Sequence, residues 1–74
     1  MSVINRLDGR GHGPVARWSA EHADQVVSAK QVFDKMLEDG YLMTDVSDPK
    51  EEVVLKAFDP NATEILAVPR MIGG

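Results

Sequence analysis

The chain has 74 residues, of which 43% are hydrophobic and 27% charged, with a net charge of −4 and no cysteine. This length allows one domain, residues 1–74, and a domain of this size buries only about 60% of the surface that its unfolded chain exposes. The lack of cysteine excludes disulfides and thiolate zinc sites as stabilising elements. The acidic balance disfavours direct binding to duplex nucleic acid, and no apolar stretch approaches the roughly 18 residues of a membrane span. We therefore expect a protein that is cytoplasmic when made and that is stabilised by a protein partner or by forming a homo-oligomer.

The N-terminal third predicts two short strands separated by a loop. Residues 2–7 and 15–18 have strand-like composition, whereas residues 8–14 contain three glycines and a proline. Glycine and proline favour irregular connections over regular elements. We predict strands at 2–7 and 15–18 around a loop at 8–14.

An amphipathic helix is predicted over residues 20–39. Apolar residues recur there at offsets of three, four and seven, which places them on one helix face. They are Val26, Ala29, Val32, Phe33, Met36 and Leu37. Ser19 is the predicted N-cap, with Asp24 as the alternative if the first turn frays. Gly40 is predicted to end the helix in the left-handed conformation that glycine adopts without steric cost.

Beyond the helix the apolar period changes to two, which is typical of strands. Strands are predicted at 41–46, 53–58 and 64–68, with turns at 47–52 and 59–63. The turn at 59–63 contains Asp-Pro-Asn, which suits a tight reversal, so the last two strands are predicted to form a hairpin. The fold class is therefore α+β: one amphipathic helix packed on a small, mainly antiparallel sheet in the order ββαβββ.

The predicted core combines three large rings with aliphatic residues from the helix and the strands. It consists of Trp18, Phe33 and Phe58, with Val26, Met36, Leu37, Leu42, Val54, Ile65 and Val68 around them. Trp18 and Tyr41 flank the helix, and we expect both rings to close the ends of this core.

No residue pattern indicates a catalytic or metal site. The segment 8–13 is rich in glycine but lacks the lysine and the serine or threonine of a phosphate-binding loop. His12 and His22 have no serine, cysteine or carboxylate at the spacing of a catalytic set. The acids of the turn after residue 44 do not match a calcium loop; they are Asp45, Asp48, Glu51 and Glu52. We expect a protein that is not an enzyme and that uses no cofactor or metal.

The end of the chain is more apolar than a strand with one wet face requires. Residues 65–72 have six apolar positions, whereas alternate positions would suffice for such a strand. Exposed apolar segments mark interaction sites. The predicted partner-binding site consists of Leu66, Val68, Pro69, Arg70, Met71 and Ile72. Residues 69–74 are predicted to form a C-terminal tail. The alternative is that Met71 and Ile72 fold back over the sheet edge.

Several short motifs resemble those of short uncharacterised proteins of phages and bacteria. These proteins have Trp before a helix, Phe-Asp within it, Gly-Tyr after it, then Phe-Asp-Pro, an apolar strand, a proline and Gly-Gly. The matching positions are Trp18, Phe33-Asp34, Gly40-Tyr41, Phe58-Asp59-Pro60, Pro69 and Gly73-Gly74. The pattern covers about three quarters of the chain, and no function comes with it.

The chain also resembles ubiquitin-like β-grasp modifiers in its length, its strand–helix–strand order and Gly73-Gly74. This resemblance implies a β-grasp-like sandwich and conjugation through the terminal glycines. The apolar Met71-Ile72 departs from the polar tail of such modifiers.

The leading functional hypothesis is a non-enzymatic assembly module, specifically a structural (virion) protein of a phage or prophage. The alternative is a ubiquitin-like modifier conjugated through Gly73 and Gly74. A third hypothesis is a small regulator that binds a larger enzyme or nucleoprotein through the acidic helix face.

Overall fold

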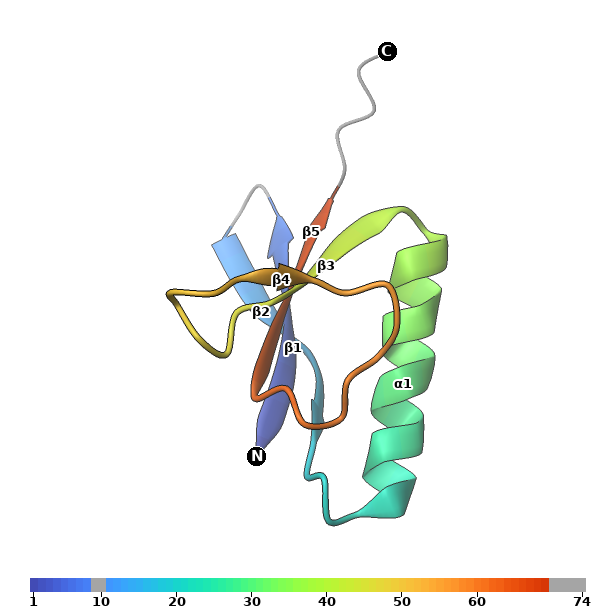
Figure 1. Cartoon of the computed structure of the whole chain (residues 1–74). Coiled ribbons are helices and arrows are strands. Elements are labelled where there is room, and N and C mark those ends of the chain that lie inside the picture. The colour runs from blue at the N-terminus through green and yellow to red at the C-terminus, as the bar shows by residue number, and fades with distance from the viewer. Residues whose placement is uncertain (9–10, 70–74) are drawn as a thin grey trace.

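The computed structural model describes residues 1–8 and 11–69, which form five strands and a helix in the predicted ββαβββ order (Figure 1). The elements are β1 (Ser2–Asp8), β2 (Gly11–Trp18), α1 (Ala23–Glu38), β3 (Tyr41–Asp45), β4 (Val53–Val54) and β5 (Glu64–Pro69).

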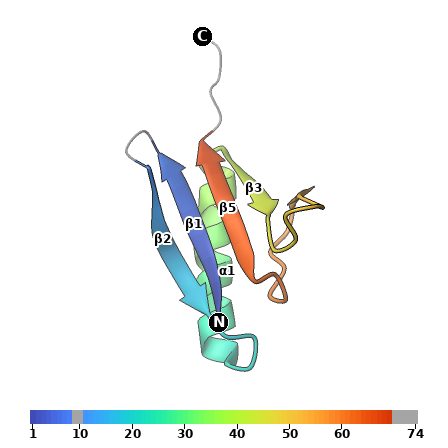
Figure 2. The ribbon, with the colours of Figure 1, turned by 90° about the vertical axis from the view of Figure 1, so that its left-hand side faces the viewer.

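The strands form one mixed sheet in the order β2-β1-β5-β3-β4. Three neighbouring pairs are antiparallel, and the central pair of β1 and β5 is parallel. Figure 2 shows α1 packed behind this sheet, and no helix among the described residues covers the other face. The protein is therefore a two-layer α+β sandwich with one helix on a mixed sheet, which confirms the predicted fold class.

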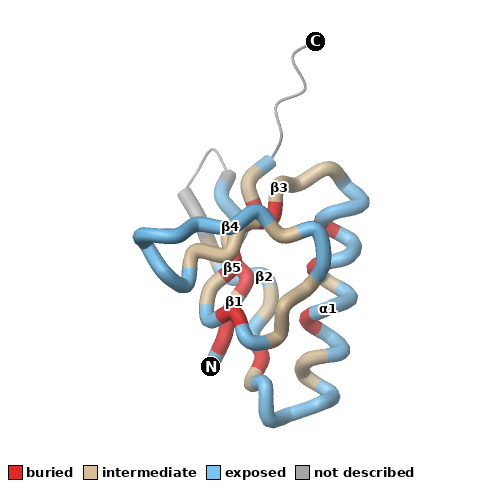
Figure 3. The backbone as a smooth tube through the Cα atoms, in the orientation of Figure 1, coloured by how far each residue is buried: buried red, intermediate tan, exposed pale blue. Residues whose placement is uncertain are grey.

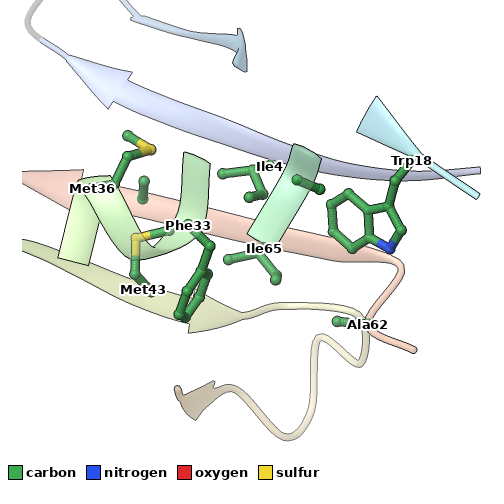
Figure 4. Packing of buried hydrophobic residues seen from close by; sticks show 9 residues of the cluster. Ile4, Trp18, Phe33, Met36, Met43, Ala62 and Ile65 are labelled. Carbon is green, nitrogen blue, oxygen red and sulfur yellow. The ribbon is translucent and has the colours of Figure 1, made fainter. Parts of the chain in front are cut away.

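The core lies between α1 and the sheet (Figures 3 and 4). Its buried residues are Ile4, Trp18, Ala29, Phe33, Met36, Met43, Ala62, Ile65 and Ala67. Burial follows the strand alternation, because successive side chains point to opposite faces of a sheet. In β5, Ile65 and Ala67 are buried in the core, whereas Leu66 and Val68 are only half-buried.

An aromatic cluster is part of the core and consists of the three rings that were predicted to be its large residues. Trp18 and Phe33 are fully buried, and the half-buried Phe58 lies between them. The ring centroid of Phe58 is 5.0 Å from that of Trp18 and 5.6 Å from that of Phe33. Trp18 Nε1 donates a hydrogen bond of 3.0 Å to the Pro60 carbonyl oxygen, so the ring is buried without an unpaired polar group.

The predicted hairpin between the last two strands is wrong. β4 is only two residues long, and β5 pairs with β1 and β3 rather than with β4. The physical reason is Phe58, whose ring is drawn into the core and carries the intervening chain away from the sheet edge. Ser47 Oγ then accepts a 2.9 Å hydrogen bond from the Thr63 amide, which ties the start of β5 to the end of β3.

The helix begins later than predicted. Its N-cap is His22, whose side chain makes no capping hydrogen bond, rather than Ser19 or Asp24. The chain first makes a turn in which the His22 amide donates to the Ser19 carbonyl at 2.9 Å. Gln25 Oε1 accepts a 2.9 Å hydrogen bond from the Ser19 amide, so a side chain of the first helical turn binds back to this turn.

The end of the helix is as predicted. Gly40 has φ +97°, the left-handed conformation that favours glycine. The Gly40 amide donates to the Leu37 carbonyl at 3.1 Å, which pairs one of the carbonyls left free at a helix end. Tyr41 follows directly as the first residue of β3, half-buried against the core as expected.

Four predicted core residues lie elsewhere. Leu37 and Val54 are exposed, at 36% and 55%. Leu42 and Val68 are directly paired across β3 and β5, on the face away from α1. The alternation in 41–46 was therefore identified correctly, but the buried residue of β3 is Met43 and not Leu42.

The N-terminal strands are longer than predicted. β2 begins at Gly11, so the predicted loop at 8–14 is in large part strand. A β-bulge, at the register shift between Ile4 and Asn5, lets Pro14 be accommodated in this edge strand.

Candidate docking surface on the open sheet face

The sheet has an open face, defined here as the side opposite α1. Side chains directly across from each other on neighbouring strands share a face. Val68 lies opposite Leu42, and Leu66 lies opposite Thr44 on one side and Asn5 on the other. All of them alternate with buried core residues, so they project away from the helix.

Apolar side chains gather on this face near the end of β5. Leu7 of β1 lies two residues after Asn5, so by strand alternation it shares the face. We call Leu7, Leu42, Leu66 and Val68 the apolar patch. Leu7 is 36% exposed and the other three are half-buried. At the sheet edge Val54, opposite Thr44 and 55% exposed, extends this surface.

The other end of the open face carries charged and polar side chains around Val3. Glu64, the first residue of β5, lies opposite Val3, and its Oε2 accepts a 3.0 Å hydrogen bond from Asn5 Nδ2. The exposed Arg17 of β2 lies opposite Val3 on the other side. The open face therefore changes along β5 from polar at Glu64 to apolar at Val68.

The predicted site is thus only partly described by the structure. Leu66 and Val68 lie in the apolar patch, and Pro69 is exposed at the end of β5, opposite Tyr41. The remaining predicted residues lie outside the described residues; they are Arg70, Met71 and Ile72, together with the conjugation candidates Gly73 and Gly74.

The position of β5 restricts how a partner can bind to it. Both edges of β5 are paired, one with β1 and the other with β3. A partner strand therefore cannot be added beside it, and contact with Leu66 and Val68 must be made face-on. Sequence reasoning did not identify Leu7 and Leu42 as members of this surface. The alternation in 41–46 correctly placed Leu42 and Met43 on opposite faces, but Leu42 was assigned to the core.

The outer face of α1 carries two ion pairs beside the exposed apolar residues Val27 and Leu37. Lys30 Nζ lies 2.6 Å from Asp34 Oδ2, and Lys35 Nζ lies 3.1 Å from Asp39 Oδ1, both as exposed i,i+4 pairs. The hydrogen bond from Lys35 to Asp39, together with the charges of Asp39 and Glu38, raises the pKa of the Lys35 ammonium above its ordinary value of 10.5. Exposed pairs of this kind add little stability.

The described residues contain neither a pocket nor a group of three potential metal ligands. His22 is exposed at the helix N-cap, and the side chain of His12 is outside the described part of the chain. The predictions that the protein is not an enzyme and binds no metal remain predictions. No helix among the described residues is long and apolar enough to cross a membrane.

Comparisons of the chain with protein-family models, curated proteins and solved structures give no match. The resemblances to short phage proteins and to β-grasp modifiers therefore stay predictions. The geometry of the open face is the basis for a functional proposal.

Proposed function

We propose that this protein is a non-enzymatic assembly module that associates with copies of itself through the open sheet face, as a structural protein of a phage or prophage virion. The observation that carries the proposal is the apolar patch at the C-terminal end of β5. A sheet with one face in water needs apolar residues on its core side only. Here the side away from the helix also presents Leu7, Leu42, Leu66 and Val68.

The size of the patch suits weak association between many copies. Fully burying a Leu or Val side chain stabilises by about 1.5–3 kcal/mol relative to leaving it exposed. The four patch residues retain about a third of their exposure or less, so covering them contributes at most about 2–4 kcal/mol per patch. Contacts of this strength are effective where the local concentration is high, as in a multi-copy particle.

The charge distribution also supports contact at this face. The exposed ion pairs of α1 lie on the opposite side of the molecule from the patch (Figure 2). The charged residues of the open face, Arg17 and Glu64, have opposite signs and lie toward the other end of the sheet. A second copy can therefore approach the patch without facing a cluster of like charges.

The virion part of the proposal is based on the motif pattern shared with short phage proteins. Its aromatic positions, Trp18, Phe33 and Phe58, form one cluster, and Gly40 ends the helix. These positions thus have structural roles. The virion part of the proposal rests on the resemblance of the pattern to short phage proteins.

The proposal is tested by measuring oligomeric state with a matched pair of substitutions. Val68→Lys places a charge in the patch, whereas Val53→Lys places the same charge at a site that is 52% exposed and opposite Asp45, off the open face. We expect wild type and Val53→Lys to associate in sedimentation velocity experiments, and Val68→Lys to remain monomeric with unchanged far-UV circular dichroism. A wild type that stays monomeric at millimolar concentration, or a folded Val68→Lys that associates like Val53→Lys, would contradict it.

A further inference from the structure

We propose that two copies pack open face to open face about a two-fold axis that runs along β1, so that Arg17 of each copy pairs with Glu64 of the other. This inference rests on the proposed function, because it names the surface that covers the open face and the orientation in which it does so. Three observations carry it: the row of side chains that contains Arg17 and Glu64, the unpaired charge of Arg17, and the change of polarity along β5.

Arg17 and Glu64 lie in one row across the open face. Val3 of β1 is paired with Arg17 of β2 on one side and with Glu64 of β5 on the other. Arg17 lies between Ala16, which packs against the core, and the buried Trp18, so its side chain points away from α1. The strands that carry Arg17 and Glu64 are two strand spacings apart, or about 10 Å. The row therefore has a positive charge at one strand and a negative charge two strands away.

The guanidinium of Arg17 is unpaired in the described part of the chain. Its side chain is exposed, and within residues 1–8 and 11–69 it makes no hydrogen bond or ion pair. The half-buried Glu64 accepts its 3.0 Å hydrogen bond from the neutral side-chain amide of Asn5. A free cation and a carboxylate that is paired with no cation are complementary to the same two groups on a second copy.

The change of polarity along β5 selects the relative direction of the strands. Sheets that pack face to face keep their strand directions within about 30° of each other. If the strands of two fully overlapping copies ran in opposite directions, Val68 of one copy would lie over Glu64 of the other. A two-fold axis along the strands instead sets the apolar ends of the two faces level with each other, and likewise the charged rows.

The charges of the row then fix the position of the axis. An axis along β5 would place Glu64 over Glu64 of the other copy, and like charges disfavour contact. An axis along β1 exchanges the places of β2 and β5, because these strands are its two neighbours (Figure 2). Arg17 of each copy then faces Glu64 of the other across a sheet spacing of about 10 Å, which two long side chains bridge.

This arrangement covers most of the apolar patch and closes at two copies. Leu7 lies on β1 and meets Leu7 of the other copy, while Leu66 and Val68 face β2 of the other copy. Leu42, on β3, lies at the margin of the contact. Because the same surface is used by both copies, the contact is isologous and produces a dimer. We therefore expect the open face to form dimers that salt weakens, since salt screens exposed charges.

Charge reversal in full-length chains tests the inference. Arg17→Glu places two carboxylates opposite each other at both ends of the row, and Glu64→Arg places two guanidinium groups there. We expect each variant alone to keep its far-UV circular dichroism and to dimerise about tenfold or more weakly than wild type in sedimentation velocity experiments. Mixed together, they should form a 1:1 heterodimer, because both pairs of opposite charge are then restored.

Lys30→Glu is the matched control, because it changes the net charge as Arg17→Glu does, at an exposed site on α1. It should dimerise as wild type does. If instead it weakens dimerisation as much as Arg17→Glu, the effect is one of net charge and the two-fold arrangement is overturned.

The remaining outcomes separate this inference from the proposed function. If Arg17→Glu and Glu64→Arg associate as wild type does, the two-fold arrangement is overturned, and assembly through the open face is decided by Val68→Lys alone. If both charge variants are monomeric and their mixture stays monomeric, the pairing of Arg17 with Glu64 is also overturned. If wild type itself is monomeric at millimolar concentration, both proposals fail.

Discussion

Replacing Phe58 by Leu isolates the contribution of the aromatic cluster to stability. The Phe58 ring is tilted by 59° against Trp18 at a centroid distance of 5.0 Å, and it meets Phe33 edge-on at 5.6 Å. Leucine restores most of the apolar surface, but it has no ring quadrupole to interact with either neighbour. The substitution therefore removes two ring–ring contacts and leaves the chain topology unchanged.

The expected loss follows from those two contacts. Each aromatic pair contributes about 0.5–1.5 kcal/mol beyond the area that it buries, so Phe58→Leu should lower the free energy of unfolding by about 1–3 kcal/mol. At about 0.05–0.15 kcal/mol per residue, a chain of this size has a total stability of only about 4–11 kcal/mol. A loss of about 2 kcal/mol corresponds to a fall in Tm of about 12 °C for a domain of this length.

Thermal and urea unfolding measure this loss directly. The chain has one tryptophan, and because Trp18 packs on Phe58 its fluorescence reports on the cluster, while circular dichroism follows the backbone. Val53→Thr, at a site that is 52% exposed, is the control and should change stability by less than about 0.5 kcal/mol. A Tm for Phe58→Leu within about 2 °C of wild type would refute the assignment of Phe58 as a structural anchor.

Two further predictions concern the helix end. Gly40→Ala should destabilise the fold by about 1–2 kcal/mol in urea titrations, because φ is +97° and the cost is backbone strain rather than a clash. Gly13→Ala, where an added Cβ also meets nothing within 4 Å and φ is not positive, should cost clearly less, and equal losses would argue against strain. The pKa of Lys35, followed by NMR, should lie above 10.5 in wild type and fall toward that value in Asp39→Asn. Because the pKa of Lys35 is raised in the folded state, the Lys35–Asp39 pair stabilises the fold fully at pH values below the unfolded-state pKa. This contribution is lost as the pH rises through the folded-state pKa. A Lys35 pKa that does not change in Asp39→Asn would contradict Asp39 as the cause of the shift.

The local elements could be predicted from the sequence because short-range physics determines them. The stripe of apolar residues from Val26 to Leu37 indicated the helix, and Gly40 indicated its end, since only glycine adopts the left-handed conformation there at no steric cost. The strand at 64–68 was also predicted, although Val68, which was placed in the predicted core with Ile65, lies on the open face. The exact start of the helix was missed, because the Gln25 side chain binds the Ser19 amide and no propensity encodes that contact.

The candidate site shows where local patterns are insufficient. Leu66 and Val68 could be identified as an apolar excess in the sequence. Leu7 and Leu42 could not be joined to them, because they come from strands that are distant along the chain. Strand alternation indicates which residues share a face, but it does not indicate which strands are neighbours.

The sequence by itself thus determined the α+β class, the element order and the apolar excess near the C-terminal end, because residue spacing and turn chemistry act over a few positions. Only the tertiary structure decided that β5 lies between β1 and β3, that the last two strands form no hairpin, and that Leu66 and Val68 lie on an open face. The physical reason is that strand pairing is a long-range choice. It is made here by the burial of Phe58 against Trp18 and by the fit of β5 between two partners.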